Sequence, residues 1–429
     1  MRLTNVAQLR LPFGTLIGYS PTATAAQEGL PISFDQRRHV RGGQRPGSWM
    51  ALSFRLPHQV PREDLEAAWL AVIARHGTLR SAFHLSDDGE PQLDSIDVGA
   101  GQWVEHPIAP GQAVNDALRD VLDMACAPLQ APSHRLCVVE TAAGPSIILA
   151  ADHAHVDMWS MLILVRDLLA ALQAIDDGGL PELPAAPPFA AHTRALQEME
   201  EAPSEIRERW HDVLTASGGG MPQFPLPLGA DGAQPERVEV RDVFDIETSA
   251  AFSFHAREEN VSTLALAVSI MTSVTRELAD APLRAVFPVH SRHEQAWHDS
   301  VGWFITNAVL ESTDAEPRAC AAAVREAIRL GSRPLDDILR PWGGMPQTPG
   351  MFAISWLDLR RLPVRIDARR LDAHYVGASI ETDDVMLWFI LDDSGLHLRC
   401  RYPDTTEARA NVGAWLDLLV ERLQAAGRA

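Results

Sequence analysis

The sequence contains no lysine, so every one of its 37 basic residues is arginine. This absence excludes chemistry that needs a lysine amine, including the Walker A phosphate loop, Schiff-base catalysis and the attachment of pyridoxal phosphate. Cysteine is scarce: Cys126, Cys137, Cys320 and Cys400 are scattered without C-x-x-C spacing, which is typical of reduced thiols in a cytoplasmic protein. The G-x-S-x-G nucleophile elbow of hydrolases is also missing.

Long apolar runs are missing as well. The first twenty residues lack the roughly 7–15-residue apolar segment of a secretion signal, and no run approaches the roughly 18 apolar residues of a membrane span. The net charge of −20 argues against nucleic-acid binding, because that function requires a basic face. We therefore expect a cytoplasmic protein that binds neither nucleic acid nor a membrane.

Strand and helix patterns alternate along the 429 residues, which is typical of an α/β fold. A chain of this length exceeds the size of a single hydrophobic core, so we expect two domains. The Gly- and Pro-rich stretch 176–190 is the best linker, and it predicts an N-terminal lobe over residues 1–178 and a C-terminal lobe over 179–429. Beyond it, residues 193–214 read as one helix.

The stretch "IILAADHAHVDMWSML" (147–162) places four ionisable residues, Asp152, His153, His155 and Asp157, between two apolar segments. Crowded ionisable groups are candidates for function, since burial and neighbouring charges shift their pKa values. Three interpretations are open: a metal site, a histidine general base with supporting carboxylates, and a strand end with solvated polar residues.

The metal interpretation rests on "HAHVD" (153–157), which resembles the H-x-H-x-D-H ligand string of metallo-β-lactamase-type hydrolases. The sixth position is Met158 rather than histidine, and no later segment looks like a further set of ligands. We therefore expect no metal and keep this class of hydrolase only as a remote alternative.

The frame "DHxxxDMWS" (152–160) also resembles the HHxxxDG motif of nonribosomal-peptide condensation domains and related carrier- or CoA-dependent acyltransferases. Three other segments resemble motifs of the same superfamily in the same order: "PISFDQRRHV" (31–40), "RHGTLRSAF" (75–83) and "VGWFITNAVLES" (301–312). Arg292 stands where the family has its Gly-Arg pair. The chain is identified on these four segments as a member of this superfamily.

The resemblance implies an α/β fold of two chloramphenicol-acetyltransferase-like lobes in a V-shaped pseudo-dimer with a central tunnel. It makes His153 the catalytic base and gives Asp157 a structural role, bridging to an arginine, with Arg292 and Arg80 (and Arg75) as the candidates. Asp152 replaces the first histidine of the motif, and we expect it to alter the turn or to pair with a neighbouring arginine.

Other candidate residues follow from the same resemblance. Met158 replaces the glycine of the motif and either narrows the tunnel or substitutes for a tolerant position. Trp159 and Ser160 complete the frame, and Ser160 caps or begins the next helix without acting as a nucleophile. Trp303 and Asn307 line the tunnel or pack the lobe interface. His155 and His76 are expected to be structural.

The function implied is acyl transfer from a thioester onto an amine or hydroxyl in natural-product biosynthesis, an EC 2.3.1-like activity. The acyl group would arrive on the phosphopantetheine arm of an acyl or peptidyl carrier protein, or on CoA, with no cofactor bound to the enzyme itself. We expect a free-standing monomer that meets its carrier protein in trans through the arginine-rich stretches 36–45 or 359–370. The alternative is a non-catalytic platform that binds a carrier protein and recruits a partner enzyme.

Overall fold

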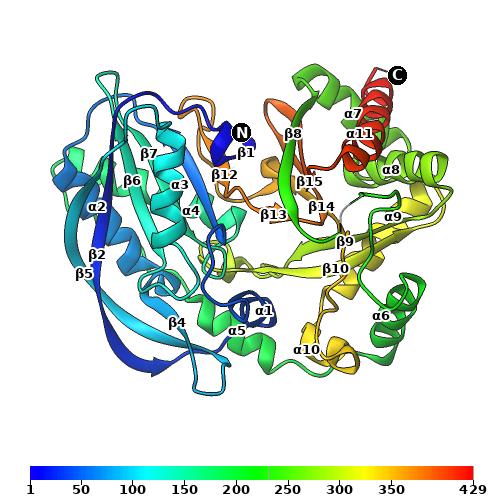
Figure 1. Cartoon of the computed structure of the whole chain (residues 1–429), viewed down its shortest axis with the longest axis horizontal. Helices are drawn as coiled ribbons and strands as arrows, with labels where there is room; N and C mark the ends of the chain where they lie inside the picture. Colours follow the sequence, from blue (N-terminus) through cyan, green and yellow to red (C-terminus); the bar gives the residue numbers. More distant parts are fainter. Residues whose placement is uncertain (230, 429) are drawn as a thin grey trace. The chain divides into compact units, whose positions relative to one another are not determined.

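The computed structural model describes residues 1–229 and 231–428. The chain divides into two compact units (Figure 1). Unit 1 comprises Met1–Glu198, Arg292–Ile305 and Leu362–Ser379, and unit 2 comprises Met199–Ser291, Thr306–Arg361 and Ile380–Ala429. Unit 1 thus includes residues 179–198, Arg292–Ile305 and Leu362–Ser379, which a division at residue 178 assigns to the C-terminal lobe.

Unit 1 is built on an eight-stranded sheet in the order β1-β12-β3-β7-β6-β2-β5-β4. Most neighbours are antiparallel, as short connections between successive strands allow. The strands are β1 (Arg2–Asn5), β2 (Thr15–Gly29), β3 (Trp49–Arg55), β4 (Ser81–Leu85), β5 (Pro91–His106), β6 (His134–Glu140), β7 (Ser146–Asp152) and β12 (His374–Gly377).

Strand β12 comes from the late segment Leu362–Ser379 and completes the sheet of unit 1. It pairs in parallel with β1 and antiparallel with β3. Tyr375 in this strand is fully buried and donates a hydrogen bond to the carbonyl of Met158, 2.9 Å away. A segment more than 200 positions away in sequence therefore holds the start of the helix that follows the 147–162 stretch.

The helices of unit 1 are α1 (Phe34–Val40), α2 (Arg62–Arg75), α3 (Val114–Ala125), α4 (Met158–Asp176) and α5 (Phe189–Gln197), with short 3₁₀ turns at Val6–Gln8, Gly77–Arg80 and Gln295–Trp297. Helix α4 packs against α2, β3 and β7. Within the described residues, α4 alone is long and apolar enough to cross a membrane, but 56% of its most apolar window is buried in the fold. This burial is typical of the core helix of a globular domain.

Unit 2 contains a seven-stranded sheet in the order β10-β9-β11-β14-β15-β8-β13. Its strands are β8 (Gln234–Phe244), β9 (Leu283–His290), β10 (Ile305–Ser312), β11 (Phe352–Asp358), β13 (Glu381–Thr382), β14 (Val385–Asp392) and β15 (Gly395–Pro403). Its helices are α6 (Ser204–Ala216), α7 (Ile246–Glu258), α8 (Thr263–Ala279), α9 (Pro317–Leu330), α10 (Leu335–Leu339) and α11 (Thr406–Ala426), with 3₁₀ turns at Arg340–Trp342 and Leu359–Arg361.

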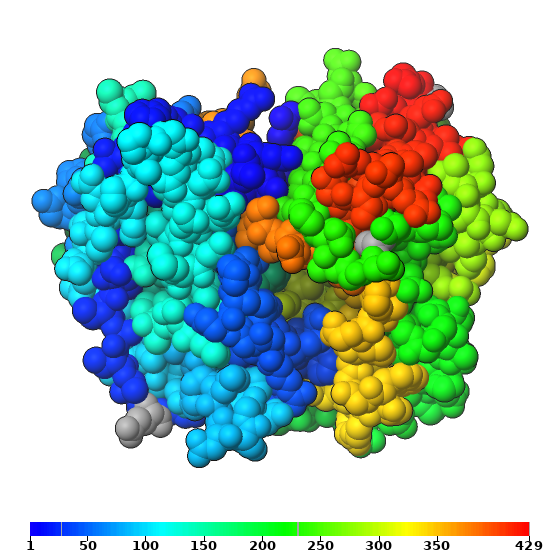
Figure 2. Space-filling model, viewed as in Figure 1, coloured from blue at the N-terminus to red at the C-terminus, as the bar shows by residue number. Residues whose placement is uncertain are grey.

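The core of unit 2 lies between one face of its sheet and helices α7, α8, α9 and α11 (Figure 1). Helix α11 shows how the sequence divides its faces. Its buried face carries Val412, Trp415, Leu416, Leu419 and Leu423, which join this core. Its other face lies on the surface of unit 2 (Figure 2).

The α/β class is confirmed, with one mixed sheet in each unit. The prediction of one helix over 193–214 is wrong: the chain forms α5 and α6, and Pro203 stands directly before α6. Proline has no amide hydrogen and disfavours helical geometry in the residue before it, so it separates the two helices. Helix α1, helix α7 and the long strand β2 were not predicted.

Candidate active site

The 147–162 stretch forms a buried strand, a short turn and the start of a helix. All seven residues of β7 are buried, between β3 and β6. Asp152 is its last residue, and helix α4 begins at Met158. The amide of His153 donates to the carbonyl of Ser48 at 3.0 Å, so the chain remains tied to its neighbour as it leaves the sheet.

His153 lies on this turn as a partly buried side chain. Its ring stacks on the indole of Trp303, with ring centroids 4.2 Å apart and planes inclined by 26°. Its Nδ1 is buried without a hydrogen-bond partner from another residue in the described part of the chain. Burial holds the pKa of His153 below its usual value, and the charge that His39 can carry acts in the same direction. The imidazole is therefore neutral at pH 7 and able to accept a proton.

Asp157 caps the start of helix α4 and forms the centre of a buried polar cluster. Its Oδ1 accepts the amide hydrogen of Ser160 at 2.7 Å, which caps the helix. Arg292 donates from Nη1 to Oδ2 at 2.6 Å and from Nη2 to Oδ1 at 3.2 Å. Burial acts to raise the pKa of Asp157, but the charge and hydrogen bonds of Arg292 outweigh it and hold this pKa below its usual range.

Arg292 is itself only 1% exposed and satisfies several other groups. Its Nη2 donates to the hydroxyl of Ser160 at 2.7 Å and to the carbonyl of Ser300 at 3.1 Å. Its guanidinium lies 3.9 Å from the ring centroid of Phe304 and 5.0 Å from that of Trp159. The planar cation thus joins the start of α4 to the segment 292–305.

Ser160 lies in the first turn of α4, and the cap of this helix is Asp157, so the alternative that Ser160 caps the helix is wrong. The Ser160 hydroxyl donates to the carbonyl of Gly302 at 2.8 Å and accepts its amide hydrogen at 3.1 Å. A Cβ atom at Gly302 would lie 2.3 Å from Phe189. Glycine has no Cβ atom, so it alone allows the backbone at position 302 to lie this close to both Phe189 and the Ser160 hydroxyl.

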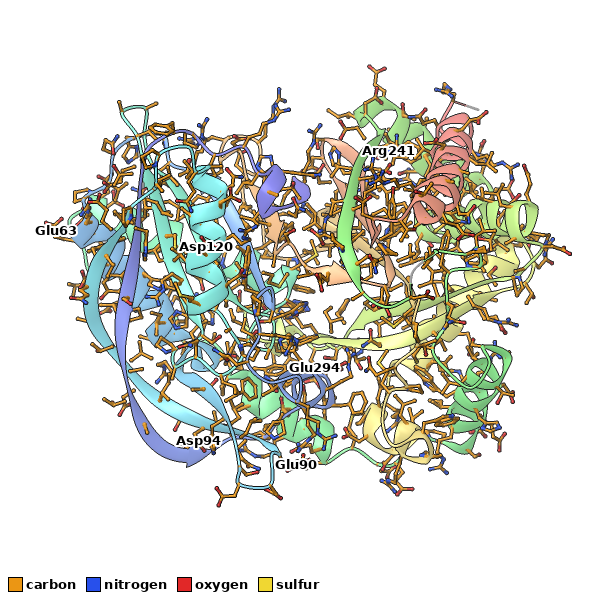
Figure 3. The ribbon with its side chains drawn as sticks, in the orientation of Figure 1. Glu63, Glu90, Asp94, Asp120, Arg241 and Glu294 are labelled. Atoms are coloured by element: carbon orange, nitrogen blue, oxygen red, sulfur yellow. The ribbon has the colours of Figure 1, made fainter. Side chains whose placement is uncertain are left out.

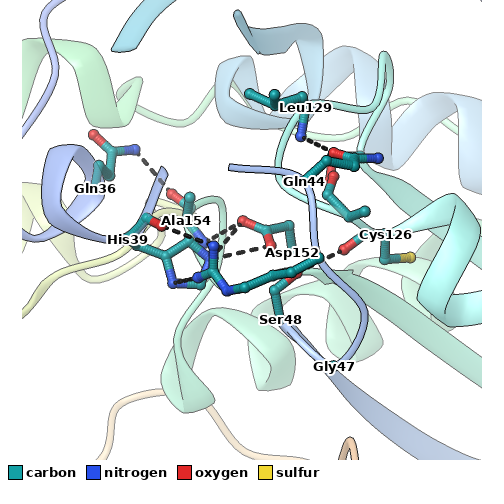
Figure 4. Close-up of polar contacts among 12 residues, drawn as sticks. Gln36, His39, Gln44, Gly47, Ser48, Cys126, Leu129, Asp152 and Ala154 are labelled. Atoms are coloured by element: carbon teal, nitrogen blue, oxygen red, sulfur yellow. Dashed lines mark hydrogen bonds and ion pairs between the residues drawn. The ribbon is translucent and has the colours of Figure 1, made fainter. Parts of the chain in front are cut away.

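Asp152, which is fully buried, pairs with a histidine of α1 and not directly with an arginine. His39 Nε2 lies 3.1 Å from each carboxylate oxygen of Asp152 (Figure 4). Oδ1 of Asp152 also accepts the amide hydrogen of Ala154 at 2.9 Å. Burial acts to raise the pKa of Asp152, but the hydrogen bond and charge of His39 outweigh it and hold this pKa below its usual value.

His155 and His76 contact other groups of unit 1. His155 is buried against Phe83, and its Nδ1 lies 3.1 Å from the carbonyl of Thr78. His76 Nε2 lies 2.8 Å from Asp167 Oδ2. Arg75 also binds Asp167, at 3.1 Å, and is therefore not a partner of Asp157. These contacts tie the end of α2 to α4.

Several candidates lie apart from the cluster around His153. Arg80 is exposed and lines a cleft of about 430 Å³ in unit 1, together with Gln36 and Arg194. It has no contact with Asp157, whose oxygens bind Arg292 and the amides of Ser160 and Phe304. Asn307 belongs to unit 2, where its amide lies 4.0 Å from the sulfur of Met345.

The H-A-H-V-D string does not converge on one point. His153 faces Trp303, His155 faces the carbonyl of Thr78, and Asp157 faces Arg292. Over residues 1–229 and 231–428, no group of three or more His, Cys, Asp or Glu side chains is arranged to hold a metal ion. The geometry therefore does not support the metallo-hydrolase alternative.

Sequence reasoning missed His39 and the backbone partners at Ser300, Gly302 and Phe304. The backbone partners leave no signal, because any residue supplies an amide and a carbonyl. His39 did leave one: it directly follows the "SFDQRR" segment, and the motif lacks its first histidine. A buried carboxylate at position 152 requires a partner from elsewhere, which is a reason to look for a nearby basic residue.

The Condensation domain family matches residues 41–329. The chain belongs to this family. Its sequence is 24% identical to the acyltransferase PapA3 of Mycobacterium tuberculosis, over 95% of this chain and 92% of that protein. It is 26% identical to an isonitrile lipopeptide synthase of the same species, over 92% of this chain but only 17% of the synthase.

Solved structures of other proteins show the same fold. The PapA2 acyl transferase superposes with a TM-score of 0.87 at 18% identity, covering 100% of both chains. The first condensation domain of the calcium-dependent antibiotic synthetase gives 0.70 at 14% identity, covering 93% of this chain and 97% of that domain. With relatives named acyltransferases over nearly their whole length, the expected enzyme class is confirmed: this condensation-family protein is an acyltransferase.

Proposed function

We propose that this condensation-family acyltransferase moves an acyl group from a thioester onto an amine or hydroxyl, with His153 as the general base. The observation that carries the proposal is the neutral, partly exposed imidazole of His153, stacked on Trp303 and placed by a turn that is hydrogen-bonded at both ends. A neutral imidazole takes the proton from the attacking nucleophile as the new bond to the carbonyl carbon forms. The C–S bond of the thioester then breaks, and the imidazolium returns the proton to the departing thiolate, which leaves as the thiol.

Asp152 and Asp157 take no proton in this scheme. Both carboxylates are buried, both have pKa values held below the usual range, and both are already hydrogen-bonded to other groups. Both carboxylates instead hold the backbone of the turn in place. Asp157 does so at the start of α4, and Asp152 does so at the end of β7. Trp303 fixes the face of the His153 ring.

The donor in this proposal is a thioester on the phosphopantetheine arm of a carrier protein, or on CoA. The relatives include an acyltransferase and a lipopeptide synthase, which favours acyl transfer in lipid or natural-product biosynthesis. No residue of the cluster around His153 serves as a covalent nucleophile, because the Ser160 hydroxyl is buried and bound to Gly302 and Arg292. The acyl group therefore passes directly from thioester to acceptor.

The arginine-rich stretches offer less free charge for carrier docking than their composition suggests. Arg41 binds Glu90 at 2.7 and 2.9 Å, on the turn between β4 and β5 (Figure 3). Arg45 turns inward to His39, and Arg360 binds both oxygens of Asp358 at 2.9 and 3.0 Å. A basic docking surface at 36–45 or 359–370 thus depends on the remaining arginines.

The acyltransferase relatives, which match over nearly the whole of both chains, disfavour the alternative of a non-catalytic platform. The same fold occurs in an epimerization domain of tyrocidine synthetase (TM-score 0.72) and in the X-domain from teicoplanin biosynthesis (0.68), so fold alone does not define the activity. The retained His153 and the complete Asp157–Arg292 pair favour the enzyme.

The test is acyl transfer by purified protein, followed by intact-mass detection of the acylated acceptor. Acyl-CoA and an acyl-loaded carrier protein serve as donors, with a panel of amines and alcohols as acceptors. We expect turnover that falls about 10²–10⁴-fold in His153→Ala. The matched control is His84→Ala, which removes an exposed histidine of β4. Turnover of His153→Ala at the wild-type rate would contradict the proposal, and carrier binding without any transfer would favour the platform.

A further inference from the structure

Helix α1 holds both ends of the Asp152–Ala154 turn, with His153 between them. Gln36 of α1 donates from Nε2 to the carbonyl of Ala154 at 2.8 Å, and His39 of the same helix contacts the Asp152 carboxylate (Figure 4). The helix is rigidly started by a capping box, in which Ser33 and Gln36 bind each other's backbone amides. A seven-residue helix therefore acts as a clamp on the turn that presents His153.

The partners of His39 fix which of its nitrogens carries the hydrogen. Arg45 places Nη2 3.1 Å from Nδ1 of His39 and donates from Nη1 to the carbonyl of the same residue at 3.0 Å. A guanidinium has only donors, so Nδ1 must accept. Nε2 then carries the hydrogen and donates it to Asp152. Arg45, His39 and Asp152 thus form a line in which Arg45 donates to His39 and His39 donates to Asp152.

The His39 ring also contacts the aromatic side chain on which His153 stacks. Its centroid lies 5.3 Å from that of Trp303 in an edge-on arrangement, with planes inclined by 78°. The centroids of His39 and His153 are 6.3 Å apart. One indole therefore touches both imidazoles, and the position of His39 bears on His153 through two routes, the Asp152 carboxylate and the Trp303 ring.

We propose that His39, held between Arg45 and Asp152, is a positioning residue for His153. It donates the hydrogen bond that keeps the Asp152 carboxylate clamped onto the backbone of the catalytic turn. This inference rests on the proposed function of His153 as the base. It gives Asp152, which replaces a histidine of the family motif, a defined partner supplied by α1.

Two substitutions of His39 distinguish the effect of its hydrogen bond to Asp152 from the effect of its ring contact with Trp303. In His39→Gln, the side-chain amide reaches the position of Nε2, so it can still donate to Asp152 and accept from Arg45, but the ring contact with Trp303 is lost. In His39→Phe the ring remains against Trp303 and both hydrogen bonds are lost. We expect kcat to fall about 10–100-fold in His39→Phe, because a displacement of about 1 Å at a reacting group can reduce a rate 10²-fold. We expect His39→Gln to stay within about fivefold of wild type, with KM little changed in both variants.

The pH dependence of kcat/KM tests the positioning role directly, because a residue that only stabilises the fold would not change it. The titratable groups that bear on His153 are His39 of α1, Asp152 of β7 and Asp157 at the start of α4. In His39→Phe the Asp152 carboxylate loses its partner from α1, and an unpaired negative charge favours the protonated imidazole. The acid limb of kcat/KM should therefore move to higher pH in His39→Phe and by less in His39→Gln.

A second measurement does not depend on acyl transfer. Diethyl pyrocarbonate modifies neutral imidazoles, and the rate of modification at His153, followed by peptide mass spectrometry against pH, reports the titration and accessibility of that ring alone. The control is His84→Gln, which removes an exposed imidazole 3.4 Å from Asp94 (Figure 3) at a site away from the turn. Its modification profile at His153 should match wild type.

The outcomes are distinguishable. The pH midpoint of diethyl pyrocarbonate modification at His153 should rise in His39→Phe and move little in His39→Gln. That result supports the positioning role even if no acyl acceptor is found and the proposed function fails. A midpoint that is unchanged in His39→Phe, or that changes equally in both variants, overturns it. Circular dichroism and thermal melting of each variant exclude loss of folded protein as the cause.

Discussion

The buried pair of Asp157 and Arg292 allows the sharpest test of the site's architecture. Both side chains are at most 1% exposed, with their closest contact at 2.6 Å. In Arg292→Met the Asp157 carboxylate keeps the amide hydrogen bonds of Ser160 and Phe304 but loses the one cation that pairs with it among the described residues. Leaving a charge buried and unpaired costs about 3–5 kcal/mol. For a unit of this size that corresponds to a melting temperature lower by about 6–20 °C.

The matched control is the pair of Arg62 and Glu140. Its contacts are equally short, 2.7 and 2.8 Å, but its side chains are 47% and 34% exposed. An exposed pair contributes about 0–1 kcal/mol, so Arg62→Met should melt within a few degrees of wild type. Both arginines bind a carboxylate through two hydrogen bonds, and the two sites differ in burial and in the further hydrogen bonds from Arg292 to Ser160 and Ser300. Differential scanning calorimetry measures the difference, and hydrogen exchange of β7 identifies the transition of unit 1.

The double variant Asp157→Asn/Arg292→Met separates an unpaired charge from lost packing. Asparagine still caps the helix and carries no charge, so the double variant should be more stable than Arg292→Met alone. The pair also has a defined pH dependence. The folded-state pKa of Asp157 lies below its usual value of about 4, so its stabilisation is complete above about pH 4 and is lost as the pH falls through the lower folded-state value. Equal melting temperatures for Arg292→Met and Arg62→Met would refute this reasoning.

Three further predictions concern the turn and its neighbours. Because the pKa of His153 is held below its usual value of about 6.5, the acid limb of kcat/KM in the acyl-transfer assay should have its midpoint below pH 6.5; a midpoint above pH 7 would contradict this. Gly302→Ala should reduce both stability and turnover, because its Cβ would lie 2.3 Å from Phe189, whereas Gly413→Ala, in open space on α11, should not destabilise the protein. Tyr375→Phe should lower stability by about 1 kcal/mol in denaturant unfolding, since it removes one buried hydrogen bond to Met158; no change would mean that water replaces the hydroxyl.

Local sequence patterns predicted the elements that carry strong periodicity. Strands β6 and β7, helix α4 and the hairpin of β14 and β15 lie where their apolar spacing placed them. The failures have local causes. Helix α1 has only seven residues, too few for a periodic pattern, and the 193–214 helix was extended through Pro203.

The division into units was less predictable, because it depends on contacts distant in sequence. The segments Arg292–Ile305 and Leu362–Ser379 belong to unit 1 although both follow residues of unit 2. No composition signal marks β12 as a strand of the first sheet, since its four residues could pair with any open edge. The family motif nevertheless singled out Arg292 as a candidate partner for Asp157, and the structure pairs them.

The two aspartates of the turn are similar in burial and in the direction of their pKa shifts, yet neither contacts the His153 ring. Asp157 is committed to Arg292 and to two backbone amides, and Asp152 is committed to His39 and to the amide of Ala154. In a Ser-His-Asp triad the carboxylate binds Nδ1 of the histidine and stabilises the imidazolium that forms. Here Nδ1 of His153 has no such partner within the described residues. Burial opposes an imidazolium at His153 and outweighs the hydrogen bond to its own backbone and the charges of Asp152 and Asp157, which favour it.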